Sequence, residues 1–261
     1  MFIVLVGPAG SGKSTLTSEL ASHIEGFGPV VAKVNFDPAV EKVPYDPDVD
    51  VRDYVTVEYF MDKGLGPNGA LIAAVDSLIN HVSEIRGRIE EVSPDYVIVD
   101  TPGQLELFAY RVGGPLVLDA ITHDYPVATV FLVDSVFMET SASIISALAL
   151  ASSVAVRLRK PQVNVISRAD MLAGEVFEDV IPRLGEEGFL TGLIEKDESI
   201  PASLKDLSYR LAEALYASGF IGDLIPVSVV MPETLDALYA KLQQILAGGD
   251  DYRFYDVVSL D

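Results

Sequence analysis

The sequence predicts an α/β fold, a doubly wound and mainly parallel sheet with helical insertions. Six short runs rich in valine and isoleucine recur along the 261-residue chain, and helix-length segments separate most of them. Continuous apolar runs are typical of parallel strands, because the helices that connect such strands bury both faces of the sheet. A chain of this length suffices for one principal domain with sizeable insertions. We therefore interpret residues 1–261 as a single domain.

The predicted elements follow in chain order. Strands are expected at residues 2–6, 30–35, 96–100, 127–134, 162–167 and 225–229. Apolar stripes at helical spacing mark two helices: Leu16, Leu20 and Ile24 belong to the stripe of residues 13–24, and Leu235 and Leu238 begin that of residues 234–246. Such stripes predict packing against the core rather than contact with a cofactor.

Two segments are longer than a minimal strand–helix–strand unit requires. Residues 36–75 contain a polar loop rich in proline and aspartate, a helical segment near residues 54–63 and a glycine-rich turn at residues 64–69. Residues 171–218 are acidic and helical in pattern, with Pro182 and Pro201 as breaks, and predict a helical lid or flank. Insertions of this length are usually functional or interfacial. The acidic tail, residues 250–261, is expected to be peripheral.

The charge balance restricts the possible partners. Asp and Glu outnumber Lys and Arg by 39 to 18, which gives a net charge of -21. Such a surface repels phosphate backbones and anionic lipid, so neither nucleic acid nor a membrane is expected as a direct partner. A polyphosphate ligand must therefore be held by local interactions that are strong enough to overcome this repulsion.

Cysteine is absent and the three histidines are scattered, which argues against thiolate or histidine metal sites. The chain begins without the pattern of a secretory signal. Apolar runs such as residues 143–156 fall short of the roughly 18 residues that a membrane-spanning helix needs. A cytoplasmic location is the expectation that follows.

The strongest motif runs from Gly7 to Ser14, with the sequence GPAGSGKS, directly after the first strand and at the start of a helix. This is the context of a P-loop, or Walker A motif, in which glycines let backbone amides turn toward a phosphate. Lys13 would supply a point charge to the β- and γ-phosphates, and the Ser14 hydroxyl would ligate Mg²⁺. The residues predicted to bind the phosphates are Gly10, Ser11, Gly12, Lys13, Ser14 and Thr15.

A second motif, DTPGQ, follows the apolar run of residues 96–100. Asp100 ends this predicted strand, where a Walker B carboxylate holds Mg²⁺, commonly through water. Gly103 matches the glycine whose amide senses the γ-phosphate in GTPases. Gln104 occupies the position of the glutamine that orients the attacking water in Ras-type GTPases.

The choice of base depends on Ser167, Arg168 and Asp170, which follow the predicted strand 162–167. A carboxylate at residue 170 can accept from both N1–H and the N2 amine of guanine, and adenine lacks both donors. Arg168 can lie flat along the base. Ser228 ends the last predicted strand, where a loop normally closes over guanine O6. The alternative is that Ser167 caps a helix and the charges behind it are solvated.

Taken together, these motifs resemble the GPN-loop GTPases. The resemblance rests on residues 35–39 (NFDPA), residues 50–53 (DVRD), the tripeptide Gly66-Pro67-Asn68, residues 100–106 (DTPGQLE) and residues 167–170 (SRAD). It implies a P-loop NTPase fold and a Mg²⁺-dependent, homodimeric GTPase related to the signal-recognition GTPases and MinD-like ATPases. It also implies that each Gly-Pro-Asn loop reaches into the nucleotide site of the partner subunit.

The resemblance further implies catalytic roles for Asp37, Asn68, Gln104 and Glu106. Asn68 would approach the γ-phosphate from the other subunit. Asp37 would position or polarise the attacking water, and Gln104 and Glu106 would orient it or link it to the opposite site. Which of these three handles the water stays open. Asp37 and Glu106 are alternatively solvated loop acids.

Several alternatives to this function remain. A MinD-like ATPase is expected to have an additional lysine where this chain has Pro8 and Ala9. Nickel-delivery GTPases use Cys and His ligands, and a small-molecule or polynucleotide kinase needs an acceptor site and preferably a basic lid. A P-loop ATPase and a nucleotide-regulated scaffold, in which slow hydrolysis times the release of a protein client, both stay open. The sequence does not identify a client.

Overall fold

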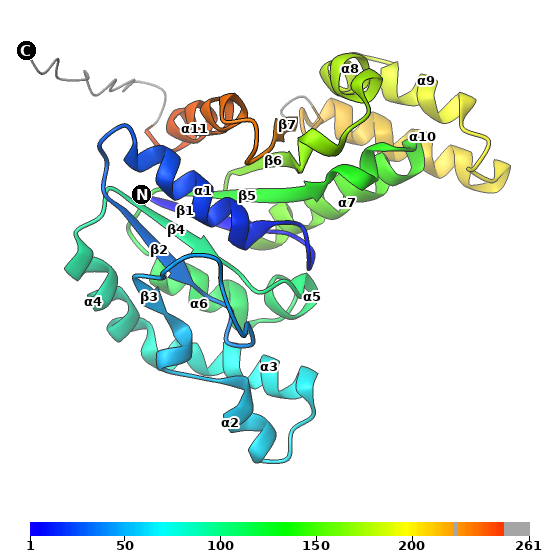
Figure 1. The fold of residues 1–261 in the computed structure, drawn as a ribbon. Helices are drawn as coiled ribbons and strands as arrows, with labels where there is room; N and C mark the ends of the chain where they lie inside the picture. The colour runs from blue at the N-terminus through cyan, green and yellow to red at the C-terminus, as the bar shows by residue number, and fades with distance from the viewer. Residues whose placement is uncertain (222–223, 248–261) are drawn as a thin grey trace, which may run out of the picture.

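A computed structural model describes residues 1–221 and 224–247, and shows helices on both faces of one sheet (Figure 1). The described residues form seven strands in the order β3-β2-β4-β1-β5-β6-β7, and every neighbouring pair is parallel. The strands are β1 (Phe2–Val6), β2 (Val31–Asn35), β3 (Val49–Asp50), β4 (Tyr96–Asp100), β5 (Val127–Asp134), β6 (Gln162–Ser167) and β7 (Leu224–Val227). The predicted doubly wound parallel sheet is confirmed. The predicted acidic tail lies outside the described residues.

The α-helices cover the sheet and build the two insertions. They are α1 (Lys13–Glu25), α2 (Val57–Asp62), α3 (Pro67–Ser77), α4 (Val82–Val92), α5 (Leu105–Phe108), α6 (Gly113–Ile121), α7 (Ser141–Leu158), α8 (Ile181–Arg183), α9 (Phe189–Lys196), α10 (Ala202–Ala217) and α11 (Glu233–Leu246). Short 3-10 turns are η1 (Val51–Asp53), η2 (Leu78–His81), η3 (Ser135–Met138) and η4 (Ala169–Met171), and a π-turn is η5 (Val176–Val180). The elements α1 and α11 lie on one face, and α4, α6 and α7 lie on the other (Figure 1).

The apolar runs are continuous because both faces of the central strands are buried. In β1, Val4 and Val6 point into the core on the α6 and α7 side, whereas Ile3 and Leu5 point into the core under α1 and α11. Each of these four side chains is completely buried. Alternation along a strand sends successive side chains to opposite faces, so a strand buried on both faces is apolar at most of its positions.

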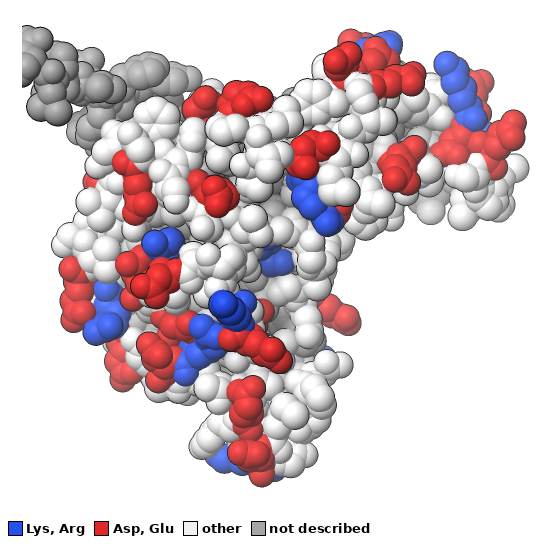
Figure 2. Space-filling model, viewed as in Figure 1, with Lys and Arg blue, Asp and Glu red and all other residues white. Residues whose placement is uncertain are grey.

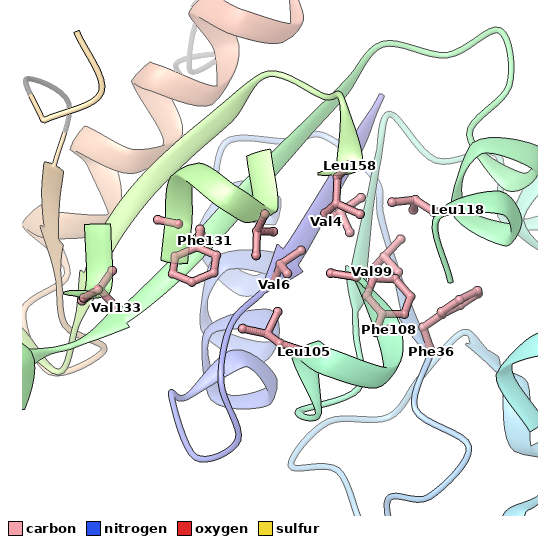
Figure 3. Close-up of a cluster of buried hydrophobic side chains, with 14 of the residues drawn as sticks. Val4, Val6, Phe36, Val99, Leu105, Phe108, Leu118, Phe131, Val133 and Leu158 are labelled. Atoms are coloured by element: carbon pink, nitrogen blue, oxygen red, sulfur yellow. The ribbon is translucent and has the colours of Figure 1, made fainter. Parts of the chain in front are cut away.

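The larger core anchors the loops that follow β2 and β4 (Figure 3). Phe36 follows the last residue of β2 and Phe108 ends α5, and the two rings meet edge to face with centroids 6.1 Å apart. Leu105, at the start of α5, belongs to the same cluster. Aromatic pairs of this kind contribute about 0.5 to 1.5 kcal/mol beyond the area that they bury. Loop residues next to Phe36 and Leu105 are therefore held at fixed positions beside the sheet edge.

The first insertion differs in two respects from its prediction. It contains a short strand, β3, which pairs with β2 through Val34–Val49 and Asn35–Asp50. Two residues are too few for a periodic pattern, so this strand was not predicted, and the last strand, expected as the sixth, is β7. The Gly-Pro-Asn tripeptide begins a helix that was not predicted, because Gly66 is the N-cap of α3 and Pro67 opens the helix. Proline is favoured at the first helical position, where its missing N–H costs nothing.

The second insertion is helical, as the sequence predicts. The segment from η5 through α10 extends away from the sheet beyond β6 (Figure 1). Both α9 and α10 contact α7. Asp197, just after α9, accepts a hydrogen bond of 2.7 Å from the Ser141 hydroxyl at the start of α7. This contact joins the insertion to the helical layer.

The helix α7 is longer than any apolar run expected from the sequence. It has 18 residues with a mean hydropathy of 1.6, which is enough to cross a membrane by length and composition. The expectation that no segment reaches this length is wrong. The same composition occurs in core helices of folded domains, and α7 contacts β5, α9 and α10 and contributes Ile144, Leu148 and Val154 to the core.

The surface has the acidic character that the composition predicts. Figure 2 shows Asp and Glu side chains distributed over the viewed face, from the second insertion to the lower end of the first insertion. Lys and Arg side chains are fewer between them. A ligand that carries several negative charges is therefore repelled by the surface as a whole.

Candidate functional site

The strand register brings the predicted site residues to one edge of the sheet. Asn35 at the end of β2 pairs with Asp100 at the end of β4, and Leu5 of β1 pairs with Asp100 on the other side. At the other half of the sheet, Asp134 of β5 pairs with Ser167 of β6. The carboxyl ends of parallel strands are where doubly wound folds bind ligands.

The loop between β1 and α1 has the backbone that a P-loop requires. Gly10 and Gly12 have φ values of 76° and 91°, in the left-handed region that strains other residues. Gly12 is the N-cap of α1, so the free amides of the first helical turn face the same region as the loop. Lys13 is only 6% exposed, and its Nζ donates to the carbonyl oxygens of Gly7 and Pro8 at 2.9 Å.

A cavity of about 350 Å³ opens at this loop. It is lined by Ala9, Gly10, Gly12, Lys13, Ser14, Thr15, Asn35, Asp37, Val40, Asp100, Thr101 and Gly103. Burial lowers the pKa of Lys13, and the nearby carboxylates of Asp100 and Asp37 oppose this shift. The cavity therefore combines a buried cation, helix-terminal amides and two carboxylates.

Asp100 has the features expected of a carboxylate next to a metal ion. It is 2% exposed, and within the described residues its Oδ1 atom has no hydrogen-bond partner although it is buried. Burial raises the pKa of Asp100, while the hydroxyls of Ser14 and Tyr45 and the charge of Lys13 oppose the shift. Ser14 therefore lies close to the same carboxylate.

These two residues fit Mg²⁺. The ion prefers oxygen ligands, keeps several waters and uses one or two protein groups together with substrate phosphates. The Ser14 hydroxyl and the buried carboxylate oxygen beside it provide two such protein groups. Across residues 1–221 and 224–247, no group of three or more His, Cys, Asp or Glu side chains forms a denser metal site.

Asp37 faces the same cavity from the loop after β2. Its Oδ1 accepts from the Ala39 amide at 2.9 Å. Burial raises the pKa of Asp37, and the amides of Ala39 and Gly103 and the charge of Lys13 act in the opposite direction. Gly103 packs closely on the P-loop, because a Cβ at this position would lie 3.1 Å from the Ala9 Cα. The amide of Gly103 and the carboxylate of Asp37 are thus next to each other at the mouth of the P-loop.

The other three predicted catalytic residues lie on the surface. Gln104 is the exposed N-cap of α5, and Glu106 is exposed in its first turn. Asn68 is exposed at the start of α3. In the described part of the chain, none of these three side chains is among the residues that line the cavity. The fold of one chain thus brings Asp37, but not the other three, to the P-loop.

The residues predicted to recognise the base lie at the ends of β6 and β7. The Ser228 hydroxyl donates to Asp170 Oδ1 at 2.5 Å, and the Ser228 amide donates to Thr234 Oγ1 at 2.9 Å. Ser167 is buried and its hydroxyl donates to the Val133 carbonyl at 3.3 Å. The helix-cap alternative for Ser167 is therefore wrong, because its hydroxyl is used between strands and Arg168 is the N-cap of η4.

Two contacts at the site were not predicted. Arg168 has a left-handed backbone with φ of 56°, and its guanidinium pairs with Asp134. The Tyr45 hydroxyl donates to Asp100 Oδ2 at 3.0 Å. Asp134 could have been found, because it ends a predicted strand just as Asp100 does. Tyr45 lies in an irregular loop, for which no sequence periodicity exists.

A polar network supports the loop that bears Tyr45. Asp50 accepts from the Arg52 guanidinium, with 2.6 Å between Arg52 Nη2 and Asp50 Oδ2, and from Asn35 Nδ2 at 2.9 Å. Burial raises the pKa of Asp50, but the hydrogen bonds from Arg52 and Asn35 outweigh it, and the net pKa is below the ordinary range. Arg52 Nη1 also donates to the carbonyl oxygens of Val40 and Glu41 at 2.9 and 3.0 Å.

Comparisons with known proteins identify the family. Residues 5–248 match the family described as a conserved hypothetical ATP binding protein. The chain is 30% identical over 254 residues to GPN-loop GTPase 3 of Dictyostelium discoideum, a match that covers 95% of this chain and 87% of the relative. It is 34% identical over 202 residues to GPN-loop GTPase PAB0955 of Pyrococcus abyssi, with 77% and 80% of the two chains covered.

A solved structure agrees with these matches. The crystal structure of PAB0955, described as a GTPase in apo form, matches with a TM-score of 0.81 and 28% sequence identity, over 94% of this chain and 97% of that one. The family match includes the P-loop, the Gly-Pro-Asn tripeptide and the strand-end motifs within its bounds. On these grounds, the chain belongs to the GPN-loop GTPase family.

Proposed function

We propose that this protein binds GTP with Mg²⁺ and hydrolyses it to GDP and phosphate, acting as a homodimeric, nucleotide-dependent switch or assembly factor. One observation carries the proposal: the cavity at the end of β1 joins the P-loop and the buried Lys13 to two carboxylates, Asp37 and Asp100. The names of the relatives, GPN-loop GTPases, support the same reaction.

The phosphates would be held by the backbone of residues 10–15 and by Lys13. Lys13 Nζ already points into the P-loop, where two carbonyl oxygens hold it. A charge inside a low-dielectric pocket attracts an anion far more strongly than a solvated charge does. The local cation and the amides at the start of α1 thus offset the repulsion by the acidic surface.

Ser14 would hold Mg²⁺ by its hydroxyl, and Asp100 would hold it through a metal-bound water at its open Oδ1 atom. When bound, the ion would supply positive charge to the phosphates and so stabilise the charge that develops during phosphoryl transfer. Asp37, beside the Gly103 amide, is the residue of this chain placed to accept a hydrogen bond from the attacking water. Its amide contact with Ala39 fixes the carboxylate orientation.

The base side favours guanine. Asp170 presents a carboxylate whose Oδ1 is fixed by Ser228, which in turn is held by Thr234. A carboxylate accepts the two N–H groups of guanine, whereas adenine offers none at the same positions. Arg168 is aligned by Asp134 and would lie along the base. The ATP in the description of the matching family keeps an ATPase as the second candidate.

A homodimer would complete the site. Asn68 is exposed at the start of α3 and is not among the residues that line the cavity of its own chain, as far as the described residues extend. An exposed asparagine amide can donate to a phosphate oxygen of a neighbouring subunit. Gln104 and Glu106, also exposed, are placed to connect the two sites. We further propose that the protein is cytoplasmic and acts on a protein client rather than on nucleic acid or lipid.

Nucleotide titration tests the proposal. The expected result is tighter binding of GTP than of ATP, and Asp170→Asn should weaken GTP by about 2 to 3 kcal/mol, because charge-assisted hydrogen bonds are lost. Lys13→Ala should abolish tight binding of any nucleotide. A preference for ATP would establish the second candidate. Unchanged affinity in Lys13→Ala would remove the P-loop interpretation altogether.

A single-turnover measurement separates the enzyme from a scaffold. The enzyme should release phosphate from bound GTP at a rate that Asp37→Asn lowers by about 100-fold or more, because a positioned acid or base contributes about 10²- to 10⁴-fold. If GTP binds tightly and no phosphate is released by the wild-type protein, the scaffold alternative is correct.

A further inference from the structure

We infer that Tyr45 is a positioning residue for the magnesium site: its hydroxyl holds Asp100 so that one carboxylate oxygen, Oδ1, is directed to the metal. The inference rests on the proposed function, because it assumes that Asp100 faces Mg²⁺. It assigns a role to a residue of the first insertion that no motif includes.

The two oxygens of Asp100 have different surroundings. Oδ2 accepts from the Tyr45 hydroxyl at 3.0 Å, whereas Oδ1 is buried and is without a hydrogen-bond partner in the described residues. A buried acceptor without a partner is costly, so its position indicates a ligand atom that is not protein. A water bound to Mg²⁺ can donate to this oxygen.

Two hydroxyls lie near this carboxylate: that of Ser14 would serve as a metal ligand, which leaves that of Tyr45 to keep the two oxygens of Asp100 distinct. The terminal torsion of an aspartate is broad, so a free carboxylate rotates and exchanges its two oxygens. The Tyr45 hydroxyl has one proton to donate, and it occupies Oδ2. Carboxylates that bind a metal are typically held in this way by a neighbouring donor, and loss of the neighbour weakens metal binding about 10- to 100-fold.

The loop that bears Tyr45 is anchored on both sides. Before it, the carbonyl oxygens of Val40 and Glu41 accept from Arg52 at 2.9 and 3.0 Å. After it, Asp48 Oδ2 accepts from the Lys33 amide of β2 at 2.8 Å. Since both ends of the segment are tied to the sheet region, the Tyr45 side chain reaches Asp100 from a fixed base.

The hydrogen bond from Tyr45 to Asp100 is expected to affect the binding of the metal ion and not the binding of the nucleotide. Tyr45 is half-buried and is not among the residues that line the cavity within the described chain, whereas Asp100 is. Removal of the Tyr45 hydroxyl therefore changes the surroundings of Asp100 and leaves the P-loop contacts of the phosphates in place. Loss of the Tyr45 hydroxyl should therefore change the response to Mg²⁺ but not the nucleotide affinity measured without Mg²⁺.

The test is the variant Tyr45→Phe, which keeps the ring and removes the hydroxyl. GDP affinity is measured by titration with EDTA present, and the Mg²⁺ concentration for half-maximal slowing of GDP dissociation is measured separately. We expect the affinity without Mg²⁺ to change less than about twofold and the half-maximal Mg²⁺ concentration to rise about tenfold. Neither measurement requires hydrolysis.

Tyr125→Phe is the matched control. The Tyr125 hydroxyl also donates to a carboxylate, Glu90, at 3.5 Å, but it lies just before β5, at the opposite edge of the sheet. This variant should leave both measurements unchanged. A rise in its half-maximal Mg²⁺ concentration equal to that of Tyr45→Phe would overturn the inference, because the effect would then not depend on Asp100.

A double-mutant cycle with Asp100→Asn keeps the result interpretable if Tyr45→Phe also lowers stability. The loss of Mg²⁺ dependence should be non-additive, because Tyr45 acts through Asp100. Additive losses overturn the inference. An unchanged or lower half-maximal Mg²⁺ concentration in Tyr45→Phe also overturns it. If the wild-type protein itself binds GDP without any response to Mg²⁺, the proposed function fails instead.

Discussion

The position of the Arg168 side chain depends on a second side chain, Asp134. Arg168 has a left-handed backbone, exposes about half of its side chain and pairs with Asp134, which is 14% exposed. A guanidinium held by a carboxylate loses less rotamer freedom when it packs against a ligand. If Arg168 lies along the base as proposed, Asp134 would act on the base through Arg168, although the sequence motif for the base does not contain Asp134.

We expect Asp134→Asn to weaken GDP binding by about 1 kcal/mol, or about fivefold, because an Arg168 side chain without its partner must be ordered on binding. The measurement is titration with GDP in EDTA, which removes any contribution of the metal. Asp119→Asn, which breaks the surface pair of Asp119 with Lys160 at 2.7 Å, is the control and should have no effect. Equal affinities for Asp134→Asn and wild type would show that Arg168 needs no alignment.

Some residues of the site could be placed from the sequence and others could not. Lys13, Ser14 and Asp100 could be placed because a strand, a glycine-rich loop and a helix have a fixed geometry. Ser167 could not, because a serine at the end of a strand serves equally well as a cap or as a donor to the next strand, and only the β5–β6 register decides. Tyr45 contacts Asp100 across 55 positions of sequence, through a loop whose path no local pattern encodes.

Strands could be predicted from the sequence where both faces of the strand are buried. The six apolar runs are all strands because the helices cover both faces of the sheet, so that most positions within these strands are apolar. The strand β3 was missed because it exists only through its pairing with β2. The start of α3 at the Gly-Pro-Asn segment was not predicted, since glycine and proline are typical of turns as well as of helix starts.

The contact between the second insertion and α7 has a pH dependence that can be predicted. Hydrogen bonds from the Ser199 hydroxyl and the Ser141 hydroxyl lower the pKa of Asp197 to about 2. Because the folded-state pKa is below that of the unfolded chain, this contribution to the free energy of unfolding is complete above about pH 4 and is lost as the pH falls toward 2.

Asp197→Asn should therefore lower the free energy of unfolding by about 1 kcal/mol at pH 7, and the difference from wild type should shrink as the pH falls from 5 to 3. Urea unfolding at several pH values measures this. The control is Asp206→Asn, which breaks an exposed pair with Arg210 in α10 and should cost little at any pH. A difference that persists undiminished at pH 3 would contradict the assignment to the carboxylate charge.

The acidic surface of the whole molecule opposes association of two subunits, whereas the proposed role of the exposed Asn68 requires it. Two subunits of net charge -21 repel each other at long range, and this repulsion weakens as salt screens it. A nucleotide shared between two subunits would supply a specific interaction. Association is therefore expected to be stronger with bound GTP and at higher ionic strength, which light scattering can measure.

The proposed exchange of Asn68 between subunits predicts complementation between two inactive variants. Asn68→Ala lacks the donor but has an intact P-loop, and Lys13→Ala lacks the P-loop cation but has Asn68. In a mixed dimer, the intact P-loop of one subunit receives Asn68 from the other. If subunits mix at random, about half of the dimers are mixed with one complete site of two, so GTP hydrolysis should recover to about a quarter of the wild-type rate.

The control for the mixing experiment is Asn80→Ala, an exposed asparagine in η2, near the opposite end of α3, which should retain full activity alone. Each inactive variant by itself should hydrolyse GTP at well under a tenth of the wild-type rate, since the loss of a group that stabilises the transition state costs about 10²- to 10³-fold. If the mixture stays inactive although subunit exchange is demonstrated by labelled chains, Asn68 acts on the nucleotide of its own chain, and the α2–α3 segment must then move toward its own P-loop during the reaction.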